Sequence, residues 1–220
     1  MEHLQHPNKS LFTWLLAAFC VAWLPFLVFA LGGRIEALYT QHRVAWARYE
    51  VILLGMGLYA VVEILVWRNP SGRLGHSIAF LKVFTHELLH MVVSMLFLNR
   101  MIAFNAARDE GHVQYAGSGN ALIALAPYFL PFYTLLLLLV RIGFSVEAYP
   151  LFDVFLGMTY AFHLVTFWQQ QSPLQPDLQQ IGLIPAYLLI FTFNLFFLGM
   201  MLIVPSRGWI FFWKWLIYAS

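Results

Sequence analysis

The sequence has few charged residues and almost no cysteine. Its 12 Lys and Arg and 10 Asp and Glu make up 10% of 220 residues, whereas about 25% of the residues in a soluble domain are charged. This composition excludes a soluble globular protein. The cations form no basic block, which excludes DNA and RNA as partners. The single cysteine, Cys20, excludes a disulfide framework and a cysteine-based zinc site.

Long apolar runs dominate the chain instead. Hydrophobic residues make up 61% of it, and the mean hydropathy is +0.74. A helix needs about 20 apolar residues to cross the hydrocarbon core. Runs of about this length occur at residues 11–31, 51–67, 76–99, 120–140, 149–168 and 182–204. We therefore expect an all-α membrane protein with about six transmembrane helices, forming a single domain over residues 1–220 in the lipid bilayer.

Three segments depart from this pattern of simple spans. Residues 100–119 are polar and bounded by glycines, so they predict a short hairpin or loop after the third span. Pro127 and Pro131 remove backbone donors from the fourth span and predict a kink there. Residues 205–220 are rich in aromatic side chains and predict an interfacial tail at the level of the lipid headgroups.

The orientation of the protein in the membrane is not decided by its Lys and Arg residues. Alternating spans place one group on the side of the N-terminus, namely Lys9, Arg68, Arg73, Arg141, Arg207 and Lys214. The other side then has Arg34, Arg43, Arg48, Arg100 and Arg108. Because the two groups are of similar size, the excess of cations that marks a cytoplasmic side is missing.

The third span contains the sequence His86-Glu87-Leu88-Leu89-His90, an HExxH pattern. Residues four apart on a helix lie on one face, so both imidazoles can bind one zinc ion while Glu87 lies beside the zinc-bound water as general base. A five-residue pattern also arises by chance. However, a charged residue near the bilayer centre costs about 2.5 to 3.5 kcal/mol, and polar residues there usually mark a function. We therefore expect a zinc site.

With this motif in a membrane helix, the chain resembles the site-2 protease family of intramembrane zinc metallopeptidases, in particular its small branch without an appended recognition domain. The resemblance covers residues 76–197. It implies a multi-pass protein of the bacterial inner membrane that hydrolyses peptide bonds in or near transmembrane segments of membrane-protein substrates. The family's Gly-Pro-x-x-Asn and Asn-Pro-Asp-Gly elements are replaced here by residues 117–120, Gly-Ser-Gly-Asn, and residues 175–178, Gln-Pro-Asp-Leu.

The family's later Asp ligand corresponds to Asp177, so the resemblance implies a zinc site of His86, His90 and Asp177. The count of spans places Asp177 on the same membrane side as the end of the third span. Three alternatives to Asp177 as the third ligand remain open. In the first, Asp177 is only an N-cap or a solvated loop carboxylate. In the second, the fallback ligand is His163, near the end of the fifth span; in the third, Glu110 completes the site from the polar stretch.

A different class of function is also compatible with these residues. A non-catalytic membrane scaffold or a transporter holds metal without hydrolysing a bond. Transporters tend to show corresponding broken segments in two halves of the chain, and no such pairing is visible in this sequence. We therefore expect a zinc metalloprotease, with the scaffold or transporter as the alternative.

Overall fold

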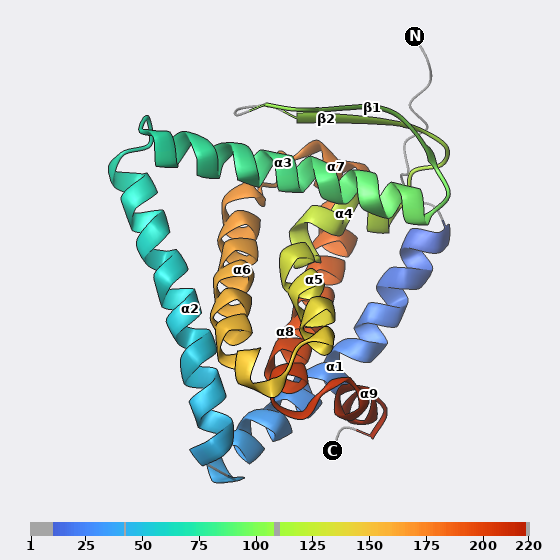
Figure 1. Cartoon of the computed structure of the whole chain (residues 1–220). Coiled ribbons are helices and arrows are strands. Elements are labelled where there is room, and N and C mark those ends of the chain that lie inside the picture. The colour runs from blue at the N-terminus through green and yellow to red at the C-terminus, as the bar shows by residue number, and fades with distance from the viewer. Residues whose placement is uncertain (1–10, 42, 108–110, 219–220) are drawn as a thin grey trace. The chain divides into compact units, whose positions relative to one another are not determined.

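The computed structural model describes residues 11–41, 43–107 and 111–218, and most of them are helical (Figure 1). Two strands and two short 3-10 helices, Arg141–Gly143 and Val146–Ala148, complete the described elements. The helices are α1 (Leu11–Gln41), α2 (Arg43–Arg68), α3 (Arg73–Leu96), α4 (Ala121–Phe129), α5 (Phe132–Val140), α6 (Tyr149–Gln170), α7 (Pro176–Ile181), α8 (Leu183–Arg207) and α9 (Trp209–Tyr218).

Among the described helices, five are long and apolar enough to cross a membrane, and these are α1, α2, α3, α6 and α8. The broken pair α4 and α5 makes a sixth candidate if it counts as one span. The break falls at Leu130 and Pro131, and Pro127 lies inside α4. The prediction of a multi-pass helical membrane protein is confirmed at this level, and so is the interruption by proline.

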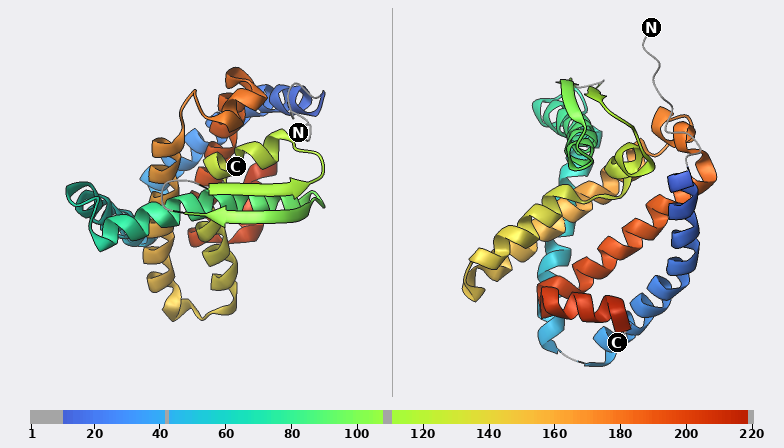
Figure 2. Two further views of the ribbon diagram at one scale, coloured as in Figure 1. Left: turned by 90° about the horizontal axis from the view of Figure 1, so that it is seen from above. Right: turned by 90° about the vertical axis from the view of Figure 1, so that its right-hand side faces the viewer.

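The polar stretch after α3 is a β-hairpin. Its strands β1 (Arg100–Ala106) and β2 (Gly111–Ala116) pair antiparallel, with Met101 opposite Tyr115 and Phe104 opposite Val113. The hairpin runs alongside α3, which both strands contact (Figure 2, left). In β2 the half-buried residues alternate with exposed ones, as expected for a strand with one covered face. This face meets α3.

The described chain divides into two compact units, each built from three stretches of sequence. The first unit contains residues up to 19, 63–130 and 166–191, and the second contains residues 20–62, 131–165 and 192–220. Helices α1, α2, α6 and α8 each contribute residues to both units, whereas α3 begins and ends in the first. That the whole chain acts as one domain with a core at 76–197 stays a prediction.

The positions of two arginines differ from those expected for alternating spans. Six alternating spans place Arg48 and Arg141 on opposite sides of the membrane. Within the second unit, however, both guanidinium groups donate to the carbonyl of Pro205, at 2.9 and 3.1 Å. Arg48 and Arg141 therefore lie close together, and their assignment to opposite sides of the membrane was wrong.

Small residues and a C-terminal helix shape the second unit. A Cβ at Gly55 of α2 would overlap the Val154 carbonyl of α6, so only glycine permits this close approach of two helix backbones. Trp215 of α9 is 1% exposed, and its indole N–H donates to the Ala30 carbonyl at 3.2 Å. Trp213 is half-exposed. The tail is thus a packed helix, and its place in the headgroup layer stays a prediction.

Candidate metal centre

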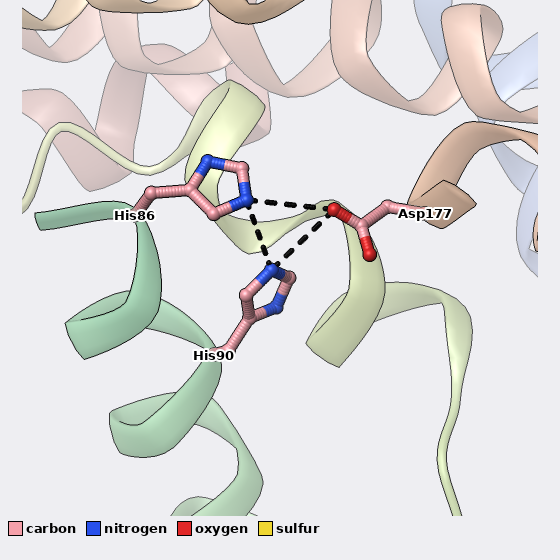
Figure 3. A group of neighbouring side chains, drawn as sticks. All are labelled: His86, His90 and Asp177. Atoms are coloured by element: carbon pink, nitrogen blue, oxygen red, sulfur yellow. Dashed lines mark hydrogen bonds and ion pairs between the residues drawn. The ribbon is translucent and has the colours of Figure 1, made fainter. Parts of the chain in front are cut away.

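His86 and His90 lie one turn apart on α3 and face the same way (Figure 3). Their ring centres are 4.8 Å apart, and their Nε2 atoms are 3.1 Å apart. The buried face of α3 is marked by residues that recur every three or four positions, namely Lys82, Thr85, Leu89 and Val93. The HExxH spacing therefore brings two imidazole nitrogens to one point.

Asp177 reaches the same point from α7. Its Oδ2 atom lies 3.5 Å from the Nε2 atom of His86 and 3.5 Å from that of His90 (Figure 3). The side chain is 23% exposed, and the N-cap residue of α7 is Gln175. Asp177 is therefore neither the N-cap nor a fully solvated loop carboxylate.

The charge state of Asp177 suits a metal ligand. Burial raises the pKa of this carboxyl, but the hydrogen bonds and charges of His86 and His90 outweigh burial, so its pKa lies below the ordinary value. Only the deprotonated carboxylate binds a metal. Asp177 is therefore a carboxylate when a positive charge lies between it and the two imidazoles.

The three donor atoms have the spacing that a small tetrahedral ion requires. Ligands at about 2.0 to 2.2 Å from zinc lie roughly 3.3 to 3.6 Å from one another. The two distances to Asp177, both 3.5 Å, lie in this range, and the 3.1 Å between the two Nε2 atoms is slightly shorter. Within the described chain, His86, His90 and Asp177 are the His, Cys, Asp and Glu residues that converge in this way. The residues therefore fit zinc.

The other ring nitrogens explain why both Nε2 atoms are available. Nδ1 of His86 lies 3.0 Å from the Gln170 side-chain oxygen, and Nδ1 of His90 lies 2.9 Å from the Ile123 carbonyl oxygen. Because both partners accept, each neutral imidazole has its proton on Nδ1 and its lone pair on Nε2. Two nitrogen lone pairs and a carboxylate then face one another, which is stable only with a cation between them, either a metal ion or a proton.

Pro127 accounts for the free carbonyl that holds His90. In a regular helix the carbonyl of residue 123 accepts from the N–H of residue 127, but proline has no N–H. The Ile123 carbonyl of α4 is therefore available for the His90 ring. The Asn120 side chain caps the start of the same helix, accepting from the Ile123 N–H at 3.0 Å. Pro127 thus affects the site indirectly, by leaving the Ile123 carbonyl free for His90.

We predict that Pro127→Ala weakens zinc binding while leaving the fold stable. The new N–H at position 127 competes with the His90 ring for the Ile123 carbonyl, and loss of such an orienting contact typically lowers metal affinity about 10- to 100-fold. Competition with a chelator of known affinity measures the change, and thermal unfolding reports stability. Pro131→Ala is the matched control, because the N–H that it creates does not compete for the Ile123 carbonyl. Equal zinc affinity in Pro127→Ala and the parent would remove Pro127 from the site.

Gln170 belongs to a polar cluster behind His86. Its neighbour Gln169 accepts from the Lys82 ammonium at 2.9 Å, and Lys82 pairs with Glu63 at 2.5 Å. These three residues help to line a cavity of about 410 Å³. Lys82 is buried, and the partly buried Glu63 balances its charge inside the unit.

Tyr128 is a site residue that the sequence reasoning missed. Its hydroxyl donates to Asp177 Oδ2 at 3.0 Å, and its ring meets the His86 ring edge-on at 5.4 Å between centres. The side chain is fully buried. Its position directly after Pro127, in the span that follows the hairpin, was the available signal. Tyr128 orients the carboxylate oxygen that faces both imidazoles.

Glu87 lies beside the centre, under the hairpin. A Cβ at Gly111 of β2 would come within 2.5 Å of Glu87 Oε1, so the missing side chain at Gly111 leaves room for the carboxylate. Tyr115, four residues further on in β2, has its pKa raised by burial and by the negative charge of Asp177. The covered face of the hairpin therefore closes over Glu87 and the three converging residues.

Of the two remaining candidates, the structure describes only His163, which does not join this group. His163 lies in the second unit, where its Nε2 atom is 3.1 Å from the Asn194 side-chain oxygen. Glu110 lies outside the described residues. Comparison of the chain with protein-family models, with curated proteins and with solved structures found no match.

Proposed function

We propose that this protein is a zinc-dependent protease that cleaves peptide bonds in or near the membrane segments of other proteins. The observation that carries the proposal is the convergence of His86, His90 and Asp177 beside Glu87, on a helix apolar enough to lie in a membrane. Three protein ligands leave a position for water, as in catalytic zinc sites. A structural site would use a fourth protein ligand, and no fourth His, Cys, Asp or Glu of the described chain joins the three.

The residues divide the chemistry between binding and proton transfer. Zinc held by the three ligands would act as a Lewis acid that polarises the scissile carbonyl and lowers the pKa of its bound water to about 7. Glu87 accepts the proton of the attacking water oxygen as the new C–O bond forms. It then donates that proton to the amine nitrogen as the C–N bond breaks. Tyr128 and Gln170 keep Asp177 and His86 in place.

The hairpin gives the substrate a place to bind in an extended form. A helical substrate has its carbonyls bonded within the helix, so it must unwind before a carbonyl reaches Glu87. Unpaired strand edges bind extended peptides through main-chain hydrogen bonds. The hairpin has two strands, so each strand has one edge that its partner leaves open. We therefore place the unwound substrate segment along an edge of the hairpin.

A cleavage assay tests the proposal. The purified protein is placed in liposomes with a single-span reporter protein, and the products are identified by mass spectrometry. We expect cleavage within or near the span, faster for a reporter with a central Gly-Gly pair that eases unwinding. A chelator should abolish cleavage, and added zinc should restore it. Glu50→Gln, at an exposed position on α2 outside the hairpin, is the control variant and should cleave like the parent.

The opposite outcome would support the alternative function. If the protein binds zinc but leaves every reporter intact, with and without the Gly-Gly pair, the proposal of a protease fails. A metal-holding scaffold or transporter would then account for the same three residues.

A further inference from the structure

The second unit contains an arginine whose buried nitrogens have no acceptor. Arg34 of α1 is 6% exposed, and its Nε and Nη2 atoms have no hydrogen-bond partner in the described chain. A buried charged donor without a partner is strongly unfavourable, so such groups are normally paired. Tyr49 offers one hydroxyl to the same guanidinium. Arg34 therefore lacks acceptors for most of its donors.

The other buried arginine of this unit shows the contrast. Arg141 pairs with Asp153 at 3.2 Å, donates to the Pro205 carbonyl and lies 3.8 Å from the Tyr149 ring centre. Arg34 has no such carboxylate among the described residues. Glu36 is only two residues away on α1, but residues two apart on a helix point to nearly opposite sides. The Nε atom of Arg141 is also buried without a partner, but Arg141 has a carboxylate that balances its charge, and Arg34 has none among the described residues.

A second cation faces the same spot. The Arg34 and Arg207 guanidinium carbons lie 5.7 and 4.5 Å from the centre of one ring, that of Phe211. Arg207 is exposed, and it forms no ion pair with a described carboxylate. The indole N–H of Trp209, two residues further on, is also buried without an acceptor. Two positive charges and several free donors therefore gather around the start of α9.

These residues lie where membrane phosphates are found. Arg34 is two residues from the end of one candidate span, which ends at Glu36, and Arg207 is the last residue of another. The ends of spans lie at the headgroup level, where tryptophans such as those of α9 also gather. Guanidinium groups bind phosphate oxygens in pairs of hydrogen bonds, and basic pockets between membrane helices bind anionic headgroups.

We infer that Arg34 and Arg207 form a binding site for a phosphate group, the headgroup of an anionic lipid or a free phosphate ion. The phosphate oxygens supply the acceptors that Arg34 lacks and balance the two positive charges. This site uses none of the residues of the metal centre, so its test does not depend on the protease proposal.

Native mass spectrometry of the whole protein in detergent tests this site. We expect the parent to retain phosphatidylglycerol in clear preference to phosphatidylcholine. Arg34→Gln, which removes the charge and the guanidinium fork but keeps a polar amide, should bind phosphatidylglycerol at least about tenfold more weakly. Arg68→Gln, which removes an exposed cation at the end of α2, is the matched control and should bind like the parent.

Two further measurements distinguish a lipid headgroup from free phosphate, and lost binding from a misfolded variant. Displacement of phosphatidylglycerol by millimolar inorganic phosphate would support a site for free phosphate, and resistance to it would support the lipid headgroup. Because Arg34 is buried and its variant can misfold, Arg207→Gln, at an exposed position, is the second test and should also weaken binding. Equal retention of both lipids by the parent, or unchanged binding in Arg207→Gln and a folded Arg34→Gln, would overturn the proposal.

Discussion

Replacing Glu87 by Gln should abolish cleavage while the protein keeps its fold and its zinc. The amide has nearly the same shape as the carboxylate and fits the space beside Gly111, but it cannot accept a proton from water. General acid–base catalysis contributes about 10²- to 10⁴-fold to a rate, so a loss of this size is expected. The reporter assay measures the rate, and elemental analysis of the same sample measures zinc.

Two comparisons make this result specific to Glu87. Glu50→Gln changes an exposed carboxylate of α2 in the same way and should cleave like the parent. A Glu87→Gln protein that loses zinc as well would show that Glu87 supports the metal centre and does not act on water. Cleavage at the parental rate would exclude Glu87 as the general base.

The parts of the site that could be predicted from the sequence are those that depend on local spacing. His86 and His90 share a helix face because a helix repeats every 3.6 residues, and any helix over this stretch gives the same result. The hairpin was signalled by a polar stretch between glycines, and the break after Phe129 by proline. These features need no knowledge of the rest of the fold.

Other parts of the site depend on contacts between segments far apart in the sequence. Tyr128 and Asp177 are 49 residues apart, and His86 and Gln170 are 84 apart. The role of Pro127 needs both the helix register of α4 and the position of His90 on α3. No pattern within a single segment contains this information, so a residue such as Gln170 looks like any polar loop residue.

Asp177 was predicted from a resemblance and not from a local spacing. The resemblance pointed to Asp177, and the structure brings it to the two imidazoles. Counting spans placed Asp177 on the same membrane side as the end of α3, and this side stays a prediction. Both segments belong to the first unit.

Replacing both His86 and His90 by Ala should remove zinc from the protein completely. Each substitution deletes one of three protein ligands, and the remaining Asp177 carboxylate cannot hold the ion alone. Asp177→Ala should weaken zinc retention as severely as a single His substitution, whereas His163→Ala should leave it unchanged. His112→Ala, an exposed histidine on β2, is the control for the loss of an imidazole.

The most direct test of the central claim is therefore the zinc content of the purified, zinc-loaded protein after loosely held ions have been washed away. Elemental analysis should find about one zinc per chain in the parent and in His112→Ala, and none in the double variant, with circular dichroism confirming that all three are helical. A parent that holds no zinc would show that a proton, rather than a metal ion, joins the three side chains. Full zinc retention in the double variant would place the metal elsewhere and contradict the site.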